Sequence, residues 1–87
     1  MTWRLVFTRQ AQKDAVKIAR AGLKPKVVHL LEILKEDPYG NLPPYEKLLG
    51  DLSGAFSRRT NVHHRLVYQV LDDIRTVKVI RMWTHYR

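Results

Sequence analysis

The chain has 87 residues, a length that fits a single domain over residues 1–87 with one sheet and one or two helices but without a deep pocket. Sixteen Lys and Arg against eight Asp and Glu give a formal net charge of +8, which favours polyanionic partners such as nucleic acid without naming one. Cysteine is absent, which excludes a disulfide scaffold and a zinc site built on thiolates. No apolar run is long enough to span a membrane, so no membrane partner is expected. Both observations fit a protein of the cytoplasm.

The first part of the chain predicts a strand followed by a helix. Residues 3–7 form a short strand pattern, and Thr8 is suited to cap a helix over residues 9–21 that Gly22 ends. The helix carries a narrow apolar stripe that should pack closely and a basic face, namely Ala11, Ala15, Ile18 and Ala19 in the stripe and Lys13, Lys17 and Arg20 on the face. This basic face is either a solvated surface or a surface that binds the phosphates of RNA.

A second helix follows and leads into a loop. It begins near Pro25, carries apolar residues at the i, i+3, i+4, i+7 spacing of a helix that covers a sheet, and stops at Asp37. Three prolines and a glycine over residues 38–45 predict an ordered loop without regular structure. This loop brings Glu46 and Lys47 to the start of the next strand.

The remaining sequence predicts strands. Residues 55–60 and 65–71 are rich in strand-forming residues and form a β-hairpin around a turn at residues 61–63. A second turn at residues 72–73 leads to a last strand over residues 76–84. Together the elements predict an α+β fold, with two helices packed on one face of a mainly antiparallel sheet of four or five strands in the order β-α-α-β-β-β.

The hairpin sets two arginines against each other. With the turn centred on Val62, Arg59 and Arg65 lie opposite one another on one face, with Cβ atoms about 5 Å apart. Facing guanidiniums repel, so the pair indicates anionic neighbours or an anionic ligand such as phosphate, which Arg binds through a planar fork of donors. Arg58 points to the other face and is expected to be structural.

Four short stretches occur in a fixed order along the chain: Glu46, LSGAFSRR at residues 52–59, HHRLVY at residues 63–68 and WTHY at residues 83–86. Together with residues 5–8, which resemble the family's first strand and its exit, they resemble the Txe/YoeB branch of the RelE-like toxins. No stretch is specific alone, but the ordered set covers nearly the whole chain. The resemblance implies a RelE-like fold and the toxin of a toxin–antitoxin system, a ribosome-dependent mRNA interferase.

The resemblance also implies roles for individual residues in metal-independent cleavage of mRNA in the ribosomal A site. The 2′-hydroxyl of RNA can attack the adjacent phosphorus if a base removes its proton and an acid protonates the departing 5′-oxygen. By the resemblance, Glu46 is the general base, and Arg65 with Arg59 binds the scissile phosphate. His85 is the general acid, and Tyr86 orients the phosphate or stacks against a base.

Two positions depart from the family pattern. Some relatives carry a lysine where this chain has Leu49, and Lys47 is the candidate to contact the RNA in its place. Arg87 follows the tyrosine at which many relatives end. Neither a metal nor another cofactor is expected, because the four histidines at positions 29, 63, 64 and 85 are not accompanied by clustered carboxylates.

The partners implied by the resemblance are the ribosome with its mRNA and an antitoxin of the YefM or Axe type. Such an antitoxin is an acidic, partly disordered segment that folds over the toxin, which suits a basic surface. A monomer and a homodimer are both left open. Two other functions stay open on the residues alone: a non-catalytic, basic nucleic-acid-binding regulatory module, and a structural subunit that contacts no RNA.

Overall fold

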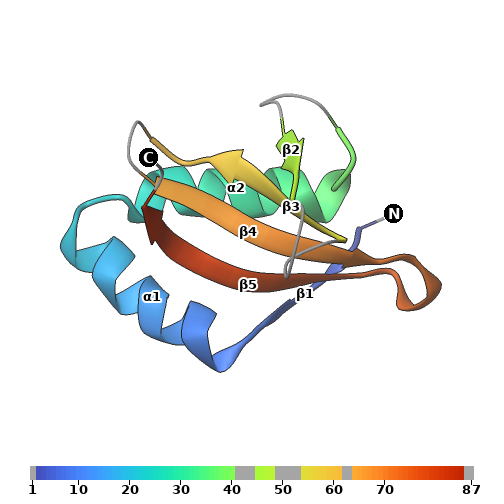
Figure 1. The fold of residues 1–87 in the computed structure, drawn as a ribbon, viewed down its shortest axis with the longest axis horizontal. Coiled ribbons are helices and arrows are strands. Elements are labelled where there is room, and N and C mark those ends of the chain that lie inside the picture. The colour runs from blue at the N-terminus through green and yellow to red at the C-terminus, as the bar shows by residue number, and fades with distance from the viewer. Residues whose placement is uncertain (1, 41–44, 49–53, 62–63, 86–87) are drawn as a thin grey trace.

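A computed structural model describes residues 2–40, 45–48, 54–61 and 64–85, with the backbone alone for residues 84 and 85. It contains two helices and a five-stranded sheet (Figure 1). The elements in chain order are β1 (Arg4–Phe7), α1 (Arg9–Arg20), α2 (Lys24–Glu36), β2 (Tyr45–Lys47), β3 (Ala55–Arg59), β4 (His64–Leu71), the 3₁₀ helix η2 (Asp72–Ile74) and β5 (Thr76–His85). The predicted α+β fold is confirmed, and the sheet has the larger of the two predicted strand numbers.

The sheet has the strand order β1-β5-β4-β3-β2, so the first strand lies beside the last (Figure 1). β1 and β5 are parallel, whereas the other three pairs are antiparallel. β5 and β4 form the centre of the sheet, and β1 and β2 form its edges. No helix in the described ranges is long and apolar enough to cross a bilayer.

Helix α1 begins and ends close to the predicted positions. Thr8 caps it, because the Thr8 hydroxyl accepts a hydrogen bond from the backbone N–H of Ala11 at 3.1 Å. After the helix, Gly22 has a φ of +73°, a backbone conformation that glycine adopts without strain. Arg9–Arg20 therefore forms one helix whose start is fixed beside the sheet, since the same Thr8 hydroxyl donates to the carbonyl of Ile80 in β5.

Helix α2 covers the sheet with the predicted stripe. Pro25 lies in its first turn, and its C-terminal cap is Asp37. The buried core joins both helices to one face of β4 and β5, and its members are Ala11, Ile18, Val27, Leu30, Leu34, Leu66, Tyr68, Val77, Val79 and Met82. Because the residues of α1 and α2 share this core, the prediction that both helices pack on one face is confirmed.

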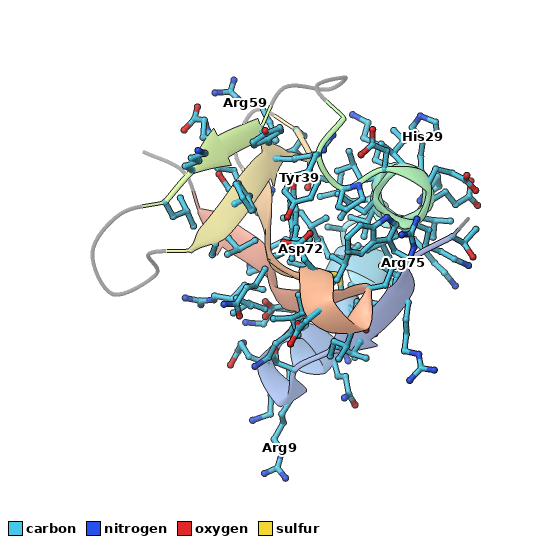
Figure 2. The ribbon with its side chains drawn as sticks, turned by 90° about the vertical axis from the view of Figure 1, so that its right-hand side faces the viewer. Arg9, His29, Tyr39, Arg59, Asp72 and Arg75 are labelled. Atoms are coloured by element: carbon cyan, nitrogen blue, oxygen red, sulfur yellow. The ribbon has the colours of Figure 1, made fainter. Side chains whose placement is uncertain are left out.

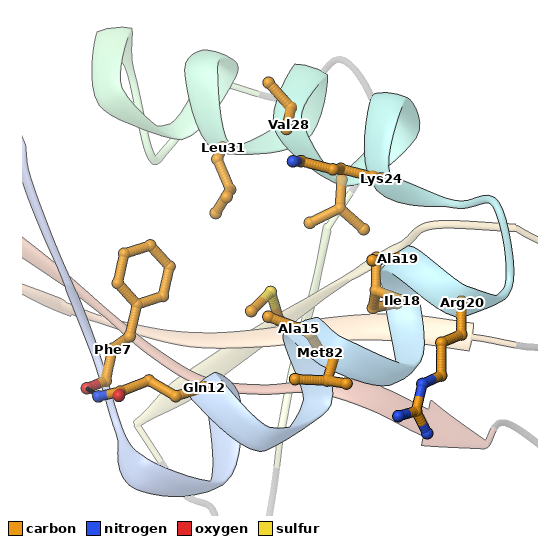
Figure 3. Close-up of a pocket in the computed structure, with 12 residues that line it drawn as sticks. Phe7, Gln12, Ala15, Ile18, Ala19, Arg20, Lys24, Val28, Leu31 and Met82 are labelled. Carbon is orange, nitrogen blue, oxygen red and sulfur yellow. Dashed lines mark hydrogen bonds between the residues drawn. The ribbon is translucent and has the colours of Figure 1, made fainter.

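The apolar stripe of α1 differs from the prediction. Ala11 and Ile18 are buried as expected, but Ala15 and Ala19 are exposed, and the third buried residue of the helix is Asp14. Ala15 and Ala19 instead line an open groove of about 620 Å³ between α1 and α2 (Figure 3). The two helices diverge there, so the small side chains face a hollow rather than a neighbouring helix. Its other lining residues are Phe7, Gln12, Val16, Ile18, Arg20, Lys24, Val27, Val28, Leu31 and Met82.

Strand β5 carries extra residues relative to its partner β4. From Leu71↔Thr76 to Tyr68↔Val79 the strands pair without interruption, but the next aligned pairs are Val67↔Arg81 and Arg65↔Thr84. The pairing therefore shifts by one residue twice, first around residue 80 and again at residues 82–83. Such a β-bulge bends a strand and leaves backbone groups outside the ladder. The second shift lies next to the end of β5 that carries residues 84 and 85.

Candidate catalytic site

The β3–β4 hairpin aligns Arg59 with Arg65, as the sequence predicted. The backbone N–H of Thr60 donates to the carbonyl of His64 at 2.9 Å, and the side chain of Asn61 accepts from the N–H of His64 at 2.8 Å. These bonds close the hairpin one residue beyond the arginine pair. Val62, the predicted centre of the turn, lies outside the described residues, as does residue 63.

Arg65 is the buried cation of the site. It is 6% exposed, and its guanidinium donates to the Ser57 hydroxyl at 3.1 Å and to Oε1 of Glu46 at 3.2 Å. Ser57 is the cross-strand partner of both Glu46 and Val67, so β2, β3 and β4 each contribute to this contact. The Glu46 side chain is 60% exposed, in contrast to the arginine. The predicted base and phosphate-binding residues therefore meet at the surface, with the carboxylate open to solvent.

Glu46 is the anionic neighbour that the arginine pair required. It carries one negative charge beside Arg65, while Arg59 lies directly opposite Arg65 and is exposed. Figure 2 shows Arg59 at the outer edge of the molecule, with its side chain directed away from the helices. The three residues together leave one net positive charge on an open face. Such an arrangement suits a phosphodiester approaching from solvent.

The backbone of His85 lies on the strand next to Arg65. In the β4–β5 ladder, Thr84 is the partner of Arg65 and His85 is the partner of His64. Neighbouring strands lie about 4.8 Å apart, so the backbone of His85 is one residue and one strand away from Arg65. Tyr86 lies outside the described residues, as do Leu49 and Arg87.

Lys47 is not brought to this group. It is the cross-strand partner of Phe56, whereas Glu46 is the partner of Ser57. Because successive side chains of a strand point to opposite faces, Lys47 lies on the face away from Glu46 and Arg65. It is exposed, at the edge strand of the sheet.

Arg58 occupies the opposite face and is structural, as predicted. It is fully buried, and its guanidinium donates to the Tyr68 hydroxyl at 2.9 Å and to the carbonyl groups of Pro38 and Gly40. Its guanidinium also lies 5.4 Å from the ring centroid of Tyr45. Burial raises the pKa of Tyr68, and the nearby arginine works against this shift. Arg58 thus ties the chain after α2 to β3, beside the strand that carries Glu46.

Tyr39 holds the chain after α2 against η2. Its hydroxyl contacts both carboxylate oxygens of Asp72, at 2.8 and 2.7 Å, and Figure 2 shows the two side chains close together. Burial, followed by the Asp72 carboxylate, raises the pKa of Tyr39 to about 12. The segment after α2 is therefore held from two sides before the chain reaches β2.

His64 lies inside the hairpin next to the strand position of His85. It is 8% exposed, and its ring stacks on Trp83 with the ring centroids 4.1 Å apart. Its Nδ1 lies 3.1 Å from the side-chain oxygen of Asn61. The contacts fix the ring as part of the packing around the end of β5. Among the described residues, no group of three His, Asp or Glu is placed to hold a metal ion.

Asp14 is the polar contact that the sequence patterns did not reveal. It is 1% exposed, and its Oδ2 accepts from the backbone N–H groups of Met82 and Trp83 at 3.0 and 3.1 Å. Gln10 donates to Oδ1 at 2.8 Å. Burial alone would raise the pKa of Asp14, but these hydrogen bonds and the charge of Arg81 lower it below the ordinary value. The only signal in the sequence is one acidic residue within a basic helix.

Comparison with known proteins identifies relatives over nearly the whole chain. Residues 7–86 match the family described as the YoeB-like toxin of bacterial type II toxin–antitoxin systems. The "Toxin YoeB" of Streptomyces coelicolor is 34% identical over 85 residues, which cover 95% of this chain and 99% of the relative.

Solved structures agree with this similarity. The "YoeB/ParE toxin from Agrobacterium tumefaciens" superposes with a TM-score of 0.84 at 33% identity, covering 95% of this chain and 99% of that one. YoeB from Staphylococcus aureus, at 32% identity and covering 99% of this chain and 100% of that one, has been solved as a YoeB–YefM complex and as a YoeB dimer, with TM-scores of 0.75 and 0.77.

Proposed function

This chain belongs to the family of YoeB-like toxins of bacterial type II toxin–antitoxin systems, and we propose that it is a ribosome-dependent endoribonuclease that cuts mRNA in the A site. Its fold is the RelE-like α+β fold of that family. The observation that supports catalysis is the contact of Glu46 with Arg65, opposite Arg59. A carboxylate and a guanidinium are in contact there, and Arg59 is paired with Arg65 across the hairpin.

In the proposed reaction, Glu46 removes the proton of a 2′-hydroxyl, and the 2′-oxygen forms a bond to the adjacent phosphorus. The bond from phosphorus to the 5′-oxygen breaks, and His85 gives its proton to that oxygen. Arg65 and Arg59 bind the phosphate oxygens, whose charge is greater in the transition state than in the bound RNA. Tyr86 orients the phosphate or stacks on a base. The products are a 2′,3′-cyclic phosphate and a 5′-hydroxyl.

The burial of Arg65 suits this role. Its guanidinium is fixed by Ser57 and Glu46, so it meets the phosphate without first losing side-chain freedom. The exposed Glu46 carboxylate is accessible to an incoming ribose. These residues supply the base and the positive charge of the reaction from the chain itself, which supports a mechanism that does not depend on a metal.

The ribosome would supply what this open site lacks. A chain of this size encloses its substrate on one face only, so the orientation of the RNA must come from elsewhere. Holding two reacting groups in the productive geometry can lower a barrier by about 7 to 11 kcal/mol. We therefore assign to the ribosome the task of holding the mRNA against Glu46 and Arg65, and to the protein's positive charge the task of binding the ribosome.

The proposed regulatory partner is an antitoxin of the YefM or Axe type, in the cytoplasm. The groove between α1 and α2 offers it an apolar surface that includes Val16 and Val28, which are 52% and 40% exposed (Figure 3). Arg20 and Lys24 also line this groove, so its charge complements an acidic segment that presents apolar side chains to the floor. The S. aureus relative, solved with YefM and as a dimer, supports an antitoxin partner and leaves self-association as a second state.

The test is to add the purified protein to translating ribosomes and to map both new ends of the cut mRNA. A 5′-hydroxyl with a 2′,3′-cyclic or 3′-phosphate is the expected result. A 5′-phosphate would rule out attack by the 2′-hydroxyl. Ribosome binding without any new RNA end would instead indicate the alternative function, a basic regulatory module without catalysis.

A further inference from the structure

The ladder between β4 and β5 is interrupted next to the proposed catalytic end of β5. Between the pairs Val67↔Arg81 and Arg65↔Thr84, two steps on β4 correspond to three on β5. The extra residue lies at Met82 and Trp83, which makes this the second bulge of the strand. After it, Thr84 is opposite Arg65, and His85 is opposite His64.

Asp14 binds the backbone of this second bulge. One carboxylate oxygen accepts both N–H groups, from Met82 at 3.0 Å and from Trp83 at 3.1 Å. A buried N–H that leaves the ladder costs free energy unless another acceptor takes it, and a buried carboxylate likewise needs donors. Asp14 is 1% exposed, and its carboxylate supplies the acceptor that the two N–H groups of the bulge need, while they supply its donors. These partners lie 68 and 69 residues apart in the sequence.

The bulge decides which residues stand beside Arg65. Continuing the Val67↔Arg81 pairing without an extra residue would align Arg65 with Trp83 and His64 with Thr84. A slip of one residue changes every pairing that follows it. Thr84 would then no longer lie opposite Arg65, and His85 would no longer lie opposite His64.

We propose that Asp14 is a positioning residue for the cleavage reaction, which holds the second bulge of β5 and thereby sets the alignment of Thr84 with Arg65 and of His85 with His64. It touches neither RNA nor the reacting atoms. Helix α1 therefore acts on catalysis through the backbone of β5. The catalytic part of this inference rests on the proposed function, whereas the alignment itself does not.

Three variants test the inference. Asp14→Leu has a similar size and no acceptor, and Asp14→Asn keeps one side-chain oxygen that can accept from both N–H groups. Gln10→Ala is the matched control, because it removes a hydrogen bond to the same carboxylate without touching β5. For each protein, nuclear Overhauser effects between the backbones of β4 and β5 report the alignment, and kcat and KM for cleavage of ribosome-bound mRNA report its consequence.

Asp14→Leu should lose the contact between the backbone protons of Arg65 and Thr84 and lower kcat by about 100-fold, with KM changed less than threefold. Asp14→Asn and Gln10→Ala should keep the contact and lie within a few-fold of the parent. An Asp14→Leu protein that keeps the Arg65–Thr84 contact, or one that loses it with kcat unchanged, overturns the inference.

A second measurement avoids the risk that Asp14→Leu does not fold. In the parent protein, the amide-proton shifts of Met82 and Trp83 should follow one common titration below pH 4, and Asp14→Asn should abolish it. Shifts that do not titrate, or that titrate unchanged in Asp14→Asn, contradict the contact. These readouts need no activity. If the parent cuts no mRNA, the proposed function is wrong, but the nuclear Overhauser effects and the amide-proton shifts still show whether Asp14 sets the alignment.

Discussion

Arg65 donates to Glu46 across 3.2 Å, from a side chain that is 8% exposed to one that is 60% exposed. The buried partner is fixed by Ser57, and the exposed partner is open to an incoming ligand. The relationship is therefore more than a surface ion pair, which would contribute little to stability. It joins a rigid cation to a carboxylate that an incoming ligand can reach.

Glu46→Gln should lower kcat by between about 10²- and 10⁴-fold, because the amide cannot take a proton from the 2′-hydroxyl. The Gln oxygen still accepts from Arg65, so the melting temperature should change little. Glu32→Gln, which alters an exposed carboxylate on α2, is the control. His85→Gln should lower kcat to a similar extent. Initial rates of mRNA cleavage on ribosomes measure all three, and a Glu46→Gln enzyme as fast as the Glu32→Gln control would eliminate the base.

Arg59→Ala and Lys47→Ala each remove one exposed cation, but from opposite faces of the sheet. Arg59→Ala should raise the dissociation constant for ribosomes programmed with mRNA and reduce its salt dependence by about one phosphate contact. Lys47→Ala should have a smaller effect on both. The measurement is binding at several salt concentrations. Equal effects of the two changes would show that the face of the sheet does not decide contact with the RNA.

Arg58→Met should destabilise the protein strongly. The oxygens of Tyr68, Pro38 and Gly40 would each lose one hydrogen bond, and a buried polar group left unsatisfied costs about 1 to 3 kcal/mol. A total of about 3 kcal/mol corresponds to a melting temperature lower by roughly 12 to 24 °C. Thermal unfolding followed by circular dichroism measures it, with the exposed Lys78→Met as control. A shift no larger than that of the control contradicts the structural role of Arg58.

Acid should weaken the fold through Asp14. Its pKa in the folded protein lies below the ordinary value of 3.8, so its carboxylate contributes stability above pH 4 that is lost as the pH falls through the lowered pKa. The difference in free energy of unfolding between the parent and Asp14→Asn should therefore shrink as the pH falls from 5 towards 2. Urea unfolding at a series of pH values measures the difference. A gap that stays constant over this range would mean that the charge of Asp14 does not contribute.

Val28→Glu should separate regulation from catalysis. A carboxylate in the groove between α1 and α2 opposes both the apolar and the electrostatic match to an acidic segment. Affinity for the antitoxin should fall at least tenfold while the rate of mRNA cleavage stays within about twofold. Ile74→Glu is the control, since Ile74 is apolar, 63% exposed and outside the groove. Unchanged antitoxin affinity in Val28→Glu, measured by calorimetry, would place the antitoxin elsewhere.

Local sequence patterns predicted the features of this structure that depend on residues close together in the chain. The cap at Thr8 and the stop at Asp37 depend on neighbouring residues, and the alignment of Arg59 with Arg65 follows from a short turn. The resemblance named Glu46 and Arg65 together, and the structure places them in contact, although their catalytic roles stay a prediction.

Contacts between distant residues were beyond such patterns. In the sequence, Asp14 is only a polar position on a basic helix, because its partners are backbone N–H groups at the second bulge of β5. No side-chain periodicity reports a bulge. The sequence also grouped Lys47 with Glu46, because the two residues are neighbours in the chain. Neighbouring residues of a strand point to opposite faces of the sheet, so Lys47 lies on the face away from Glu46.

The pairing of β1 with β5 has a consequence for synthesis of the toxin. β5 lies between β1 and β4, so the centre of the sheet is missing until Thr76–His85 has left the exit tunnel. Contacts that span so much sequence form late in folding. Until β5 is available, β1 has no strand to pair with, and the backbone of His85 cannot take its place opposite His64.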